Sequence, residues 1–205
     1  LYKELEESTL STVRALVAGL EAKDPYLRGH AQRVTQHALA IARGMNVPEH
    51  EMLVIERAGQ LHDLGKMGIS DRILTKPAPL TRDEYEAVKQ HPVLGEQIIQ
   101  PLRFLDEVRP VIRHHHERPD RTGYPDGLGG DETNLPAKII AVADAFDAMT
   151  SPRPYRPAKQ AVDACREIAS LRNIQFDPNA ADLFCERIIP LRLAERQQDE
   201  RQRAG

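Results

Sequence analysis

The stretch Gln60-Leu-His-Asp-Leu-Gly-Lys66 places an imidazole beside a carboxylate near the end of a segment with helical apolar periodicity. Core packing does not explain the pair, because both side chains would need polar partners inside the protein. A metal site would satisfy both: neutral His62 binds one cation, and Asp63 can bridge two through its carboxylate oxygens. Lys66 lies one helical turn beyond His62 and faces the same space. We therefore expect further metal ligands elsewhere in the chain.

Length and composition indicate a soluble protein of one domain, or one domain with an appendage. The chain has 205 residues, 40% hydrophobic and 29% charged, and its net charge of −3 argues against DNA or RNA binding. Cys165 and Cys185 lack a Cys-x-x-Cys spacing, which is typical of free thiols in a reducing compartment. There is no apolar run of roughly 18 residues and no signal-peptide pattern. We expect no membrane segment in this chain and a cytoplasmic location.

Apolar residues recur at three- and four-residue spacing along most of the chain, and no segment alternates as a strand does. The sequence therefore predicts an all-α protein. Thr81 and Glu84 form a capping-box pattern, and Pro92 and Pro136 stand where a helix can begin. Stretches rich in Pro and Gly predict loops at residues 67–80 and 117–135. The expected helices cover residues 5–20, 29–44, 49–61, 81–91, 92–100, 105–116, 136–149, 158–171 and 178–189.

The domain organisation follows from the same pattern. The chain begins without Met inside a predicted helix, so we expect a fragment of a longer protein. Residues 1–22 form an N-terminal helix that would link to an upstream regulatory domain or pair in a homodimer, and packing against its own domain is the alternative. Residues 23–194 form the main domain, and residues 195–205 form a polar C-terminal tail.

Seven His and Asp residues are candidate metal ligands. Each alone could be an ordinary hydrogen-bonded side chain, but together they supply nitrogen and oxygen ligands for two cations that share a carboxylate. Asp144 lies within an apolar helical pattern, where a buried salt bridge is the alternative to a metal. His37, His50 and His114 are interpreted as structural or exposed. The candidate ligands are His30, His62, Asp63, His91, His115, His116 and Asp144.

Three cationic side chains accompany these ligands. Lys66, Arg153 and Arg156 would suit a substrate phosphate, and the planar guanidinium groups would also suit a guanine base. The alternatives are a helix C-terminus interaction for Lys66 and solvated loop charges for the arginines. Asp147 lies three residues after Asp144 and therefore on the same side of its helix.

A series of motifs runs in order from about residue 23 to residue 178. They are Gly29-His-Ala-Gln-Arg-Val34, His62-Asp-Leu-Gly-Lys-Met-Gly68, Ile73-Leu-Thr-Lys-Pro77, His91-Pro-Val-Leu-Gly95, His115-His-Glu-Arg118, Gly123-Tyr-Pro-Asp-Gly-Leu128, Val142-Ala-Asp-Ala-Phe-Asp-Ala-Met-Thr-Ser151 and Arg153-Pro-Tyr-Arg156. The series resembles the HD-GYP family, a branch of the HD phosphohydrolases. The resemblance implies an HD-domain helical core with an additional helical extension and a long signature loop.

The resemblance also implies two divalent transition metals, most often Fe or Mn and alternatively Ni, Co or Zn. One metal would be held by His30, His62, Asp63 and Asp144, and the other by His91, His115 and His116, with Asp63 bridging. Asp63, Lys66 and Asp147 would act in catalysis, with Asp147 near a metal-bound water. The substrate would contact Lys66, Tyr124, Asp147, Arg153 and Arg156.

The function implied is two-metal hydrolysis of the bacterial messenger cyclic di-GMP to linear pGpG, GMP or both. The chain would then be the output domain of a signalling protein, for example in a two-component system. The signature loop around Tyr124 would also dock a diguanylate-cyclase (GGDEF) domain. Two alternatives stay open: a binding or protein-interaction module without turnover, and an HD phosphohydrolase for another cyclic dinucleotide or a nucleotide phosphomonoester.

The chain departs from the family pattern beside the site. Tyr26 stands where some members carry a Glu that holds a third metal, which favours two metals here. Pro119-Asp-Arg121 replaces the usual Trp-Asp-Gly, and we expect the exchange of Gly for Arg to exclude a positive φ angle in the signature loop. Asn173-Ile-Gln175 replaces a turn that commonly contains Gly.

Overall fold

The computed structural model describes residues 2–23, 28–152 and 157–194. These residues form helices joined by turns and loops, with no strand among them apart from one isolated bridge between Arg172 and Phe176. The predicted all-α class is confirmed. No helix in these ranges is both long and apolar enough to cross a membrane.

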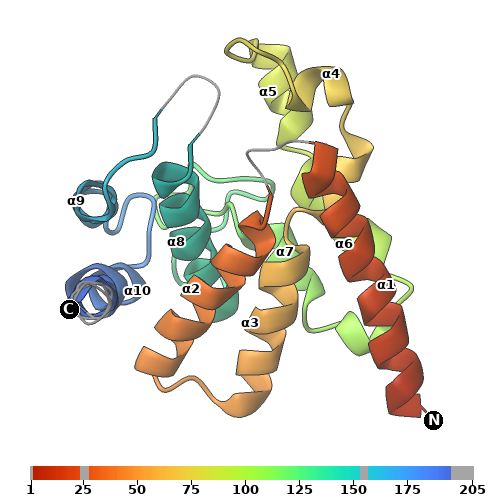
Figure 1. Cartoon of the computed structure of the whole chain (residues 1–205), viewed down its shortest axis with the longest axis horizontal. Helices are drawn as coiled ribbons and strands as arrows, with labels where there is room; N and C mark the ends of the chain where they lie inside the picture. The colour runs from red at the N-terminus through yellow and green to blue at the C-terminus, as the bar shows by residue number, and fades with distance from the viewer. Residues whose placement is uncertain (1, 24–27, 153–156, 195–205) are drawn as a thin grey trace, which may run out of the picture.

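Three helices form the centre of the fold: α2 (His30–Gly44), α3 (Glu49–Leu61) and α8 (Leu135–Thr150) (Figure 1). Their apolar stripes face one another, so that Val34, Ile55 and Ile140 are fully buried. Burial of such side chains, at about 25 cal/mol per Å² of apolar surface, is the main stabilising contribution to a core of this kind. This packing fixes where the start of α2, the end of α3 and the middle of α8 lie.

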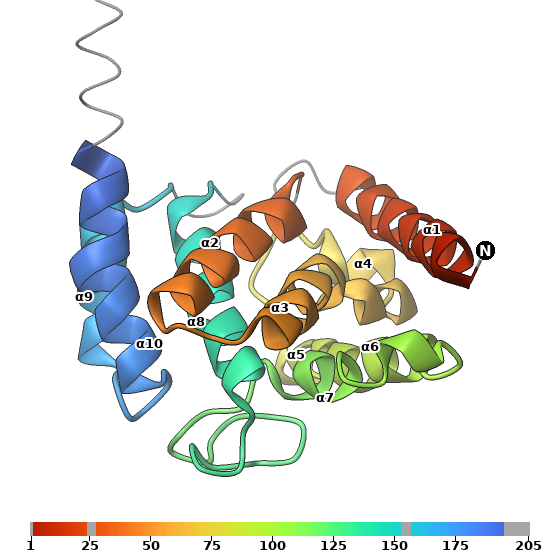
Figure 2. The same ribbon diagram turned by 90° about the horizontal axis from the view of Figure 1, so that it is seen from below.

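Further helices surround this centre. α1 (Tyr2–Lys23) lies against α3 and the 3-10 helix η1 (Leu64–Gly68), and it buries Leu10, Val13 and Val17. Figure 2 shows α5, α6 and α7 on the side of α3, and α9 and α10 on the other side, next to α8. The bounds of these five are α5 (Arg82–Val88), α6 (His91–Ile99), α7 (Arg109–His114), α9 (Ala161–Ser170) and α10 (Pro178–Leu183).

The predicted capping box at the start of α5 is confirmed. The Thr81 hydroxyl accepts a hydrogen bond from the Glu84 backbone N–H at 3.3 Å, and the Glu84 carboxylate accepts one from the Thr81 N–H at 2.7 Å. These two bonds satisfy donors that the first turn of a helix otherwise leaves without partners. The helix therefore begins at Arg82, directly after the capping residue.

Three predicted segments differ from the structure. Residues 67–80, predicted as a loop, contain α4 (Asp71–Leu74), a helix of four residues that is too short to show a periodic pattern. The helix predicted at residues 105–116 is divided into η2 (Arg103–Leu105) and α7, which begins only near Pro110 because Pro favours an early helix position. The last predicted helix passes from α10 into a π-helix, η3 (Phe184–Ile188).

The signature loop, residues 117–134, joins α7 to α8 and is ordered; it lies below the start of α8 in Figure 2. The prediction that Arg121 excludes a positive φ angle is wrong, because Arg121 has φ 66°. This conformation costs a non-Gly residue about 1–2 kcal/mol. The Arg121 side chain lies over Gly129 and pairs with Glu132 at 2.7 Å, and these contacts hold the loop in place.

Candidate metal centre

The first group of ligands joins three helices of the centre. His30 opens α2, His62 follows the last residue of α3, and Asp144 lies in the middle of α8. One ligand atom from each of the three lies within 4.8 Å of the others. The Nε2 atom of His30 is 3.2 Å from Asp144 Oδ1. The structure therefore brings together the residues predicted for one metal.

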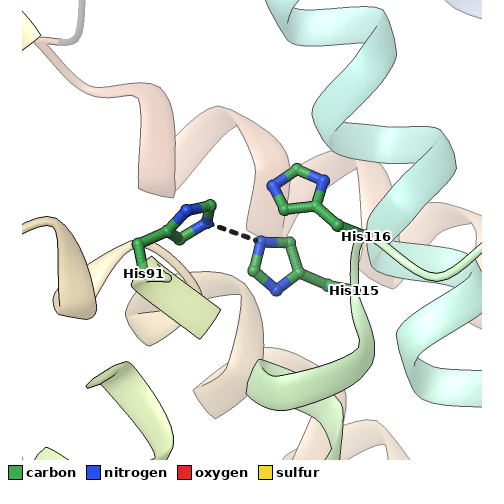
Figure 3. Close-up of side chains that lie close together, drawn as sticks. All are labelled: His91, His115 and His116. Atoms are coloured by element: carbon green, nitrogen blue, oxygen red, sulfur yellow. Dashed lines mark hydrogen bonds between the residues drawn. The ribbon is translucent and has the colours of Figure 1, made fainter. Parts of the chain in front are cut away.

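The second group consists of His91, the first residue of α6, and His115 and His116, which follow α7. Figure 3 shows the three imidazoles converging, with His91 Nε2 3.3 Å from His115 Nε2. Their ligand atoms also lie within 4.8 Å of one another. These are the three residues predicted for the other metal.

Asp63 lies between the two groups. Its Oδ2 atom is 3.6 Å from His30 Nε2 and 3.7 Å from His62 Nε2, whereas its Oδ1 atom is 3.5 Å from His91 Nε2. Each carboxylate oxygen thus faces a different group of ligands. This arrangement is the one that a bridging carboxylate needs.

The backbone orients three of the imidazoles. The Nδ1 atoms of His62, His91 and His115 lie 2.9, 2.8 and 2.7 Å from carbonyl oxygens three residues earlier in the chain. These contacts suit Nδ1–H donors and leave Nε2 as the ligand atom. His62 Nε2 is buried and has no hydrogen-bond partner in the described residues. Since a buried polar atom without a partner is costly, this nitrogen fits a metal ligand.

His30 is oriented by a side chain instead. Its Nδ1 atom is 2.7 Å from Asp147 Oδ2, while its Nε2 atom faces Asp63 and Asp144. Asp147 is also held by Arg33, whose Nε donates to Asp147 Oδ1 at 2.6 Å. This geometry makes Asp147 a positioning residue for His30. A place for Asp147 beside a metal-bound water stays a prediction.

Replacing Asp147 with Asn should selectively lower the metal affinity of the first group of ligands. Loss of a carboxylate that orients a ligating His typically costs about 10- to 100-fold in metal affinity. We expect that loss for the site of His30, because an amide holds the imidazole less firmly, and no change for the site of His91. Titration of the metal-free variant with Mn²⁺ measures both affinities. An equal loss at both sites, or none at either, would contradict the positioning role.

The electrostatic environment lowers the pKa of some of the imidazoles and raises that of His30. Burial is the main cause that lowers the pKa of His91 to about 4 and that of His116 to about 3, so both are neutral at physiological pH. Burial also lowers the pKa of His30, but hydrogen bonds to Asp144 and Asp147 outweigh it and raise the value to about 9. A metal binds only the deprotonated ring. Binding at the first group therefore releases a proton.

The carboxylates are ionised. Burial alone would raise the pKa of Asp63, but the charges of Lys66 and the nearby imidazoles hold it well below its usual range. The Lys66 ammonium is 2.6 Å from Asp63 Oδ2, so Lys66 faces the ligands as predicted. Its contact with a substrate stays a prediction. Arg153, Arg156 and Tyr26 lie outside the described residues.

Close contact between η1 and α6 places the two groups side by side. A Cβ atom added at Gly65 would lie 1.9 Å from the carbonyl oxygen of His91 and 2.4 Å from the amide nitrogen of Gly95. Only glycine fits at such a distance between backbones. Gly65 lies two residues after Asp63, so this contact sets the distance from Asp63 to His91.

Glu117 organises the signature loop, a role that the sequence did not indicate. Its buried carboxylate accepts hydrogen bonds from the backbone N–H groups of Asp126, Gly127 and Leu128 at 2.7, 3.1 and 2.9 Å. The loop then returns to the metal ligands, because Tyr124 N–H donates to the His116 carbonyl oxygen at 3.2 Å. The Tyr124 ring lies 4.8 Å from the His116 ring, at 30° between planes.

Replacing Glu117 with Gln should loosen this loop. The amide keeps one acceptor oxygen but turns an NH₂ group toward backbone donors. We therefore expect the free energy of unfolding to fall by about 1.5–3 kcal/mol. Faster hydrogen exchange at Asp126, Gly127 and Leu128 would report the change locally. Glu107→Gln, at an exposed position, is the matched control. Unchanged exchange in the Glu117 variant would show that the three hydrogen bonds do not hold the loop.

A cavity of about 220 Å³ opens beside the second group of ligands. The candidate metal ligands His115, His116 and Asp144 line this cavity, and Tyr124 forms another part of its wall. The predicted substrate residue Tyr124 therefore borders a space that adjoins the ligands. Burial raises the pKa of Tyr124 far above its usual value, so its hydroxyl stays protonated.

Comparison with known proteins agrees with this site. Residues 14–180 match the HD domain family. The cyclic di-GMP phosphodiesterase response regulator RpfG of Xanthomonas campestris is 38% identical over 181 residues, which cover 87% of this chain and 48% of that protein. The 3'3'-cGAMP-specific phosphodiesterase 3 of Vibrio cholerae is 42% identical over 139 residues, 68% of this chain and 30% of that protein. The chain thus spans about half the length of these relatives or less.

Among solved structures, an HDG"Y"P protein from Bdellovibrio bacteriovorus has a similar fold, with a TM-score of 0.68 at 17% identity. The likeness covers 90% of this chain and 62% of that one. The family match extends over the described ligands of both groups and over the signature loop. The chain belongs to the HD domain family, in its HD-GYP branch.

Proposed function

We propose that this chain is a metal-dependent phosphodiesterase that hydrolyses cyclic di-GMP to linear pGpG, GMP or both. The observation that carries the proposal is the pair of ligand groups with one oxygen of Asp63 turned toward each. The relative named as a cyclic di-GMP phosphodiesterase supports the substrate. The relative named as 3'3'-cGAMP-specific supports that dinucleotide as a second candidate substrate.

The proposed cofactors are two divalent transition metals, with Fe or Mn preferred over Ni, Co or Zn. Bound metals would supply Lewis acidity, which lowers the pKa of a shared water and stabilises charge on the reacting oxygens. The chain itself would hold them through His30, His62 and Asp144 on one side and through His91, His115 and His116 on the other. Asp63 would connect the two.

The remaining residues bind and orient the substrate in this proposal. Lys66 would donate to a phosphate oxygen from its position beside Asp63. Tyr124 would contact the nucleoside from the wall of the cavity. Arg153 and Arg156 would add donors for phosphate or guanine, as predicted from the sequence.

The test is a substrate panel on metal-free protein reloaded anaerobically with Mn²⁺ or Fe²⁺. We expect cleavage of cyclic di-GMP, with pGpG and GMP resolved by chromatography, and slower cleavage of 3'3'-cGAMP and cyclic di-AMP. Reloaded protein that binds cyclic di-GMP tightly without cleaving any of the three would select the binding-module alternative. Arg121, in the segment that departs from the family pattern, pairs with Glu132, and its side chain does not line the cavity.

The proposal extends to the setting of the chain, as the cytoplasmic output domain of a bacterial signalling protein. The surface around Tyr124 would dock a GGDEF domain. A homodimer through α1 is supported by Tyr2, Leu5 and Leu16, which are 80%, 65% and 46% exposed on one side of that helix. Sedimentation with and without residues 1–22 tests the dimer: a monomer in both cases would exclude it.

A further inference from the structure

The cavity beside the candidate metal ligands has a size that suits part of a substrate. At about 220 Å³ it is smaller than the roughly 300–1,000 Å³ of pockets that hold whole drug-sized ligands. It adjoins Asp144 and His116, so a phosphate at the metal ligands would place an attached nucleoside in this space. Tyr85 and Tyr124 supply aromatic rings on its wall, and such rings commonly stack with bases.

Arg118 is a half-buried cation on the wall of this cavity. Within the described residues its guanidinium has no side-chain hydrogen bond or ion pair. Arg121, three residues later, pairs with Glu132, and Arg113, in α7, pairs with Asp126. The N–H donors of Arg118 are therefore available at the cavity, whereas those of Arg113 and Arg121 bind carboxylates.

Gln175 faces the same cavity from the opposite segment of the chain. Its backbone is fixed, because Gln175 N–H donates to the Leu171 carbonyl oxygen at 2.8 Å and Asn173 has φ 59°. Asp120 N–H donates to the Ile174 carbonyl oxygen at 3.2 Å, which ties this turn to the signature loop. In the described residues, the Gln175 amide has no hydrogen-bond partner. One segment that departs from the family pattern, Asn173-Ile-Gln175, thus reaches the cavity that Arg118 also lines.

We propose that this cavity is a guanine subsite in which Arg118 and Gln175 recognise the base, an assignment that rests on the proposed phosphodiesterase function. Arg donates only, and guanine O6 and N7 are a pair of acceptors. Adenine presents N7 beside an N6 amino donor, which would face the Arg donors without an acceptor. The Gln175 amide supplies an acceptor for the guanine N1–H and N2 amino group.

Arg118→Gln tests the assignment by substrate preference. A bidentate Arg–guanine pair discriminates by about tenfold or more. We expect kcat/KM for cyclic di-GMP to fall at least about tenfold while that for cyclic di-AMP is unchanged or rises. Hydrolysis of bis(4-nitrophenyl) phosphate, which has no base, should stay unchanged. Arg166→Gln, the same exchange at an exposed position of α9 outside the cavity, should alter none of these rates.

Gln175→Met provides a second variant with a side chain of similar length. It should lower kcat/KM for cyclic di-GMP several-fold and leave bis(4-nitrophenyl) phosphate hydrolysis unchanged. An equal loss on all substrates, or no loss with cyclic di-GMP in the Arg118 variant, would overturn the guanine subsite.

Binding of mononucleotides separates this inference from the proposed function. Calorimetry with GMP and AMP needs no turnover, so it reports on the subsite even if the protein cleaves nothing. We expect the unmodified protein to bind GMP about tenfold more tightly than AMP, and Arg118→Gln to lose that preference. Equal affinities in the unmodified protein would overturn the subsite. Absent hydrolysis of every phosphodiester would instead reject the proposed function.

Discussion

Replacing Asp63 with Asn should abolish phosphodiesterase activity and empty both metal sites. The side chain keeps its shape but loses the charge and one of the two oxygens that face His30 and His91. The metal-affinity loss should exceed the roughly 10- to 100-fold expected for Asp147→Asn, because Asp63 is proposed as a ligand itself. Metal analysis by mass spectrometry and a cyclic di-GMP hydrolysis assay on the same sample measure the two effects.

The matched control is Asp131→Asn, at an exposed position in the signature loop. It should retain the metal content and turnover of the unmodified protein. An Asp63 variant that holds two metals and hydrolyses cyclic di-GMP at an unchanged rate would reject the bridging role. Loss of one metal alone would show that Asp63 serves a single site.

Replacing Gly65 with Ala should separate the two groups of ligands. The new methyl group would overlap the backbone of α6 at His91, where the calculated approach is 1.9 Å. Backbone atoms cannot yield as a flexible side chain does, so we expect destabilisation of about 3 kcal/mol or more. For a chain of this size that corresponds to a fall in Tm of about 6–12 °C. Metal binding at the proposed site of His91, His115 and His116 should be lost first.

Gly19→Ala makes the same exchange in α1, where an added Cβ meets nothing within 4 Å. It should raise stability by up to about 1 kcal/mol, because Ala favours a helix over Gly. Thermal unfolding should therefore show a lower Tm for Gly65→Ala and a higher Tm for Gly19→Ala, although both variants replace Gly with Ala. Metal analysis is carried out on the same two variants. Equal Tm values for Gly65→Ala and the unmodified protein would show that η1 and α6 are not packed as described.

The sequence alone was sufficient to find the candidate metal ligands that the structure brings together, because each stands at a position that local patterns define. His62 and Asp63 follow an apolar stripe, His91 precedes a Pro at a helix start, and Asp144 interrupts an otherwise apolar helix. Helical periodicity also predicted the central helices with errors of a residue or two. The ligand positions and the helix bounds both depend on the spacing of residues close together in the chain, which can be read directly from a sequence.

Residues that act across the fold were harder to predict. Asp147 contacts His30 from 117 positions away, and Glu117 binds backbone groups rather than side chains. Gly65 is required by an approach of two backbones that no spacing reveals. Arg121 shows the converse error: intrinsic preference disfavours its φ angle, but surrounding contacts maintain it. Such features depend on tertiary packing.

Anomalous diffraction from crystals of Mn²⁺-loaded protein would show whether Asp63 bridges two metals, as proposed. We expect two anomalous peaks about 3.5–4 Å apart, as in other two-metal sites. One peak should lie within bonding distance of His30, His62 and Asp144, the other near His91, His115 and His116, and each near a different oxygen of Asp63. A single peak, or two peaks that share no Asp63 carboxylate, would contradict the bridging role of Asp63.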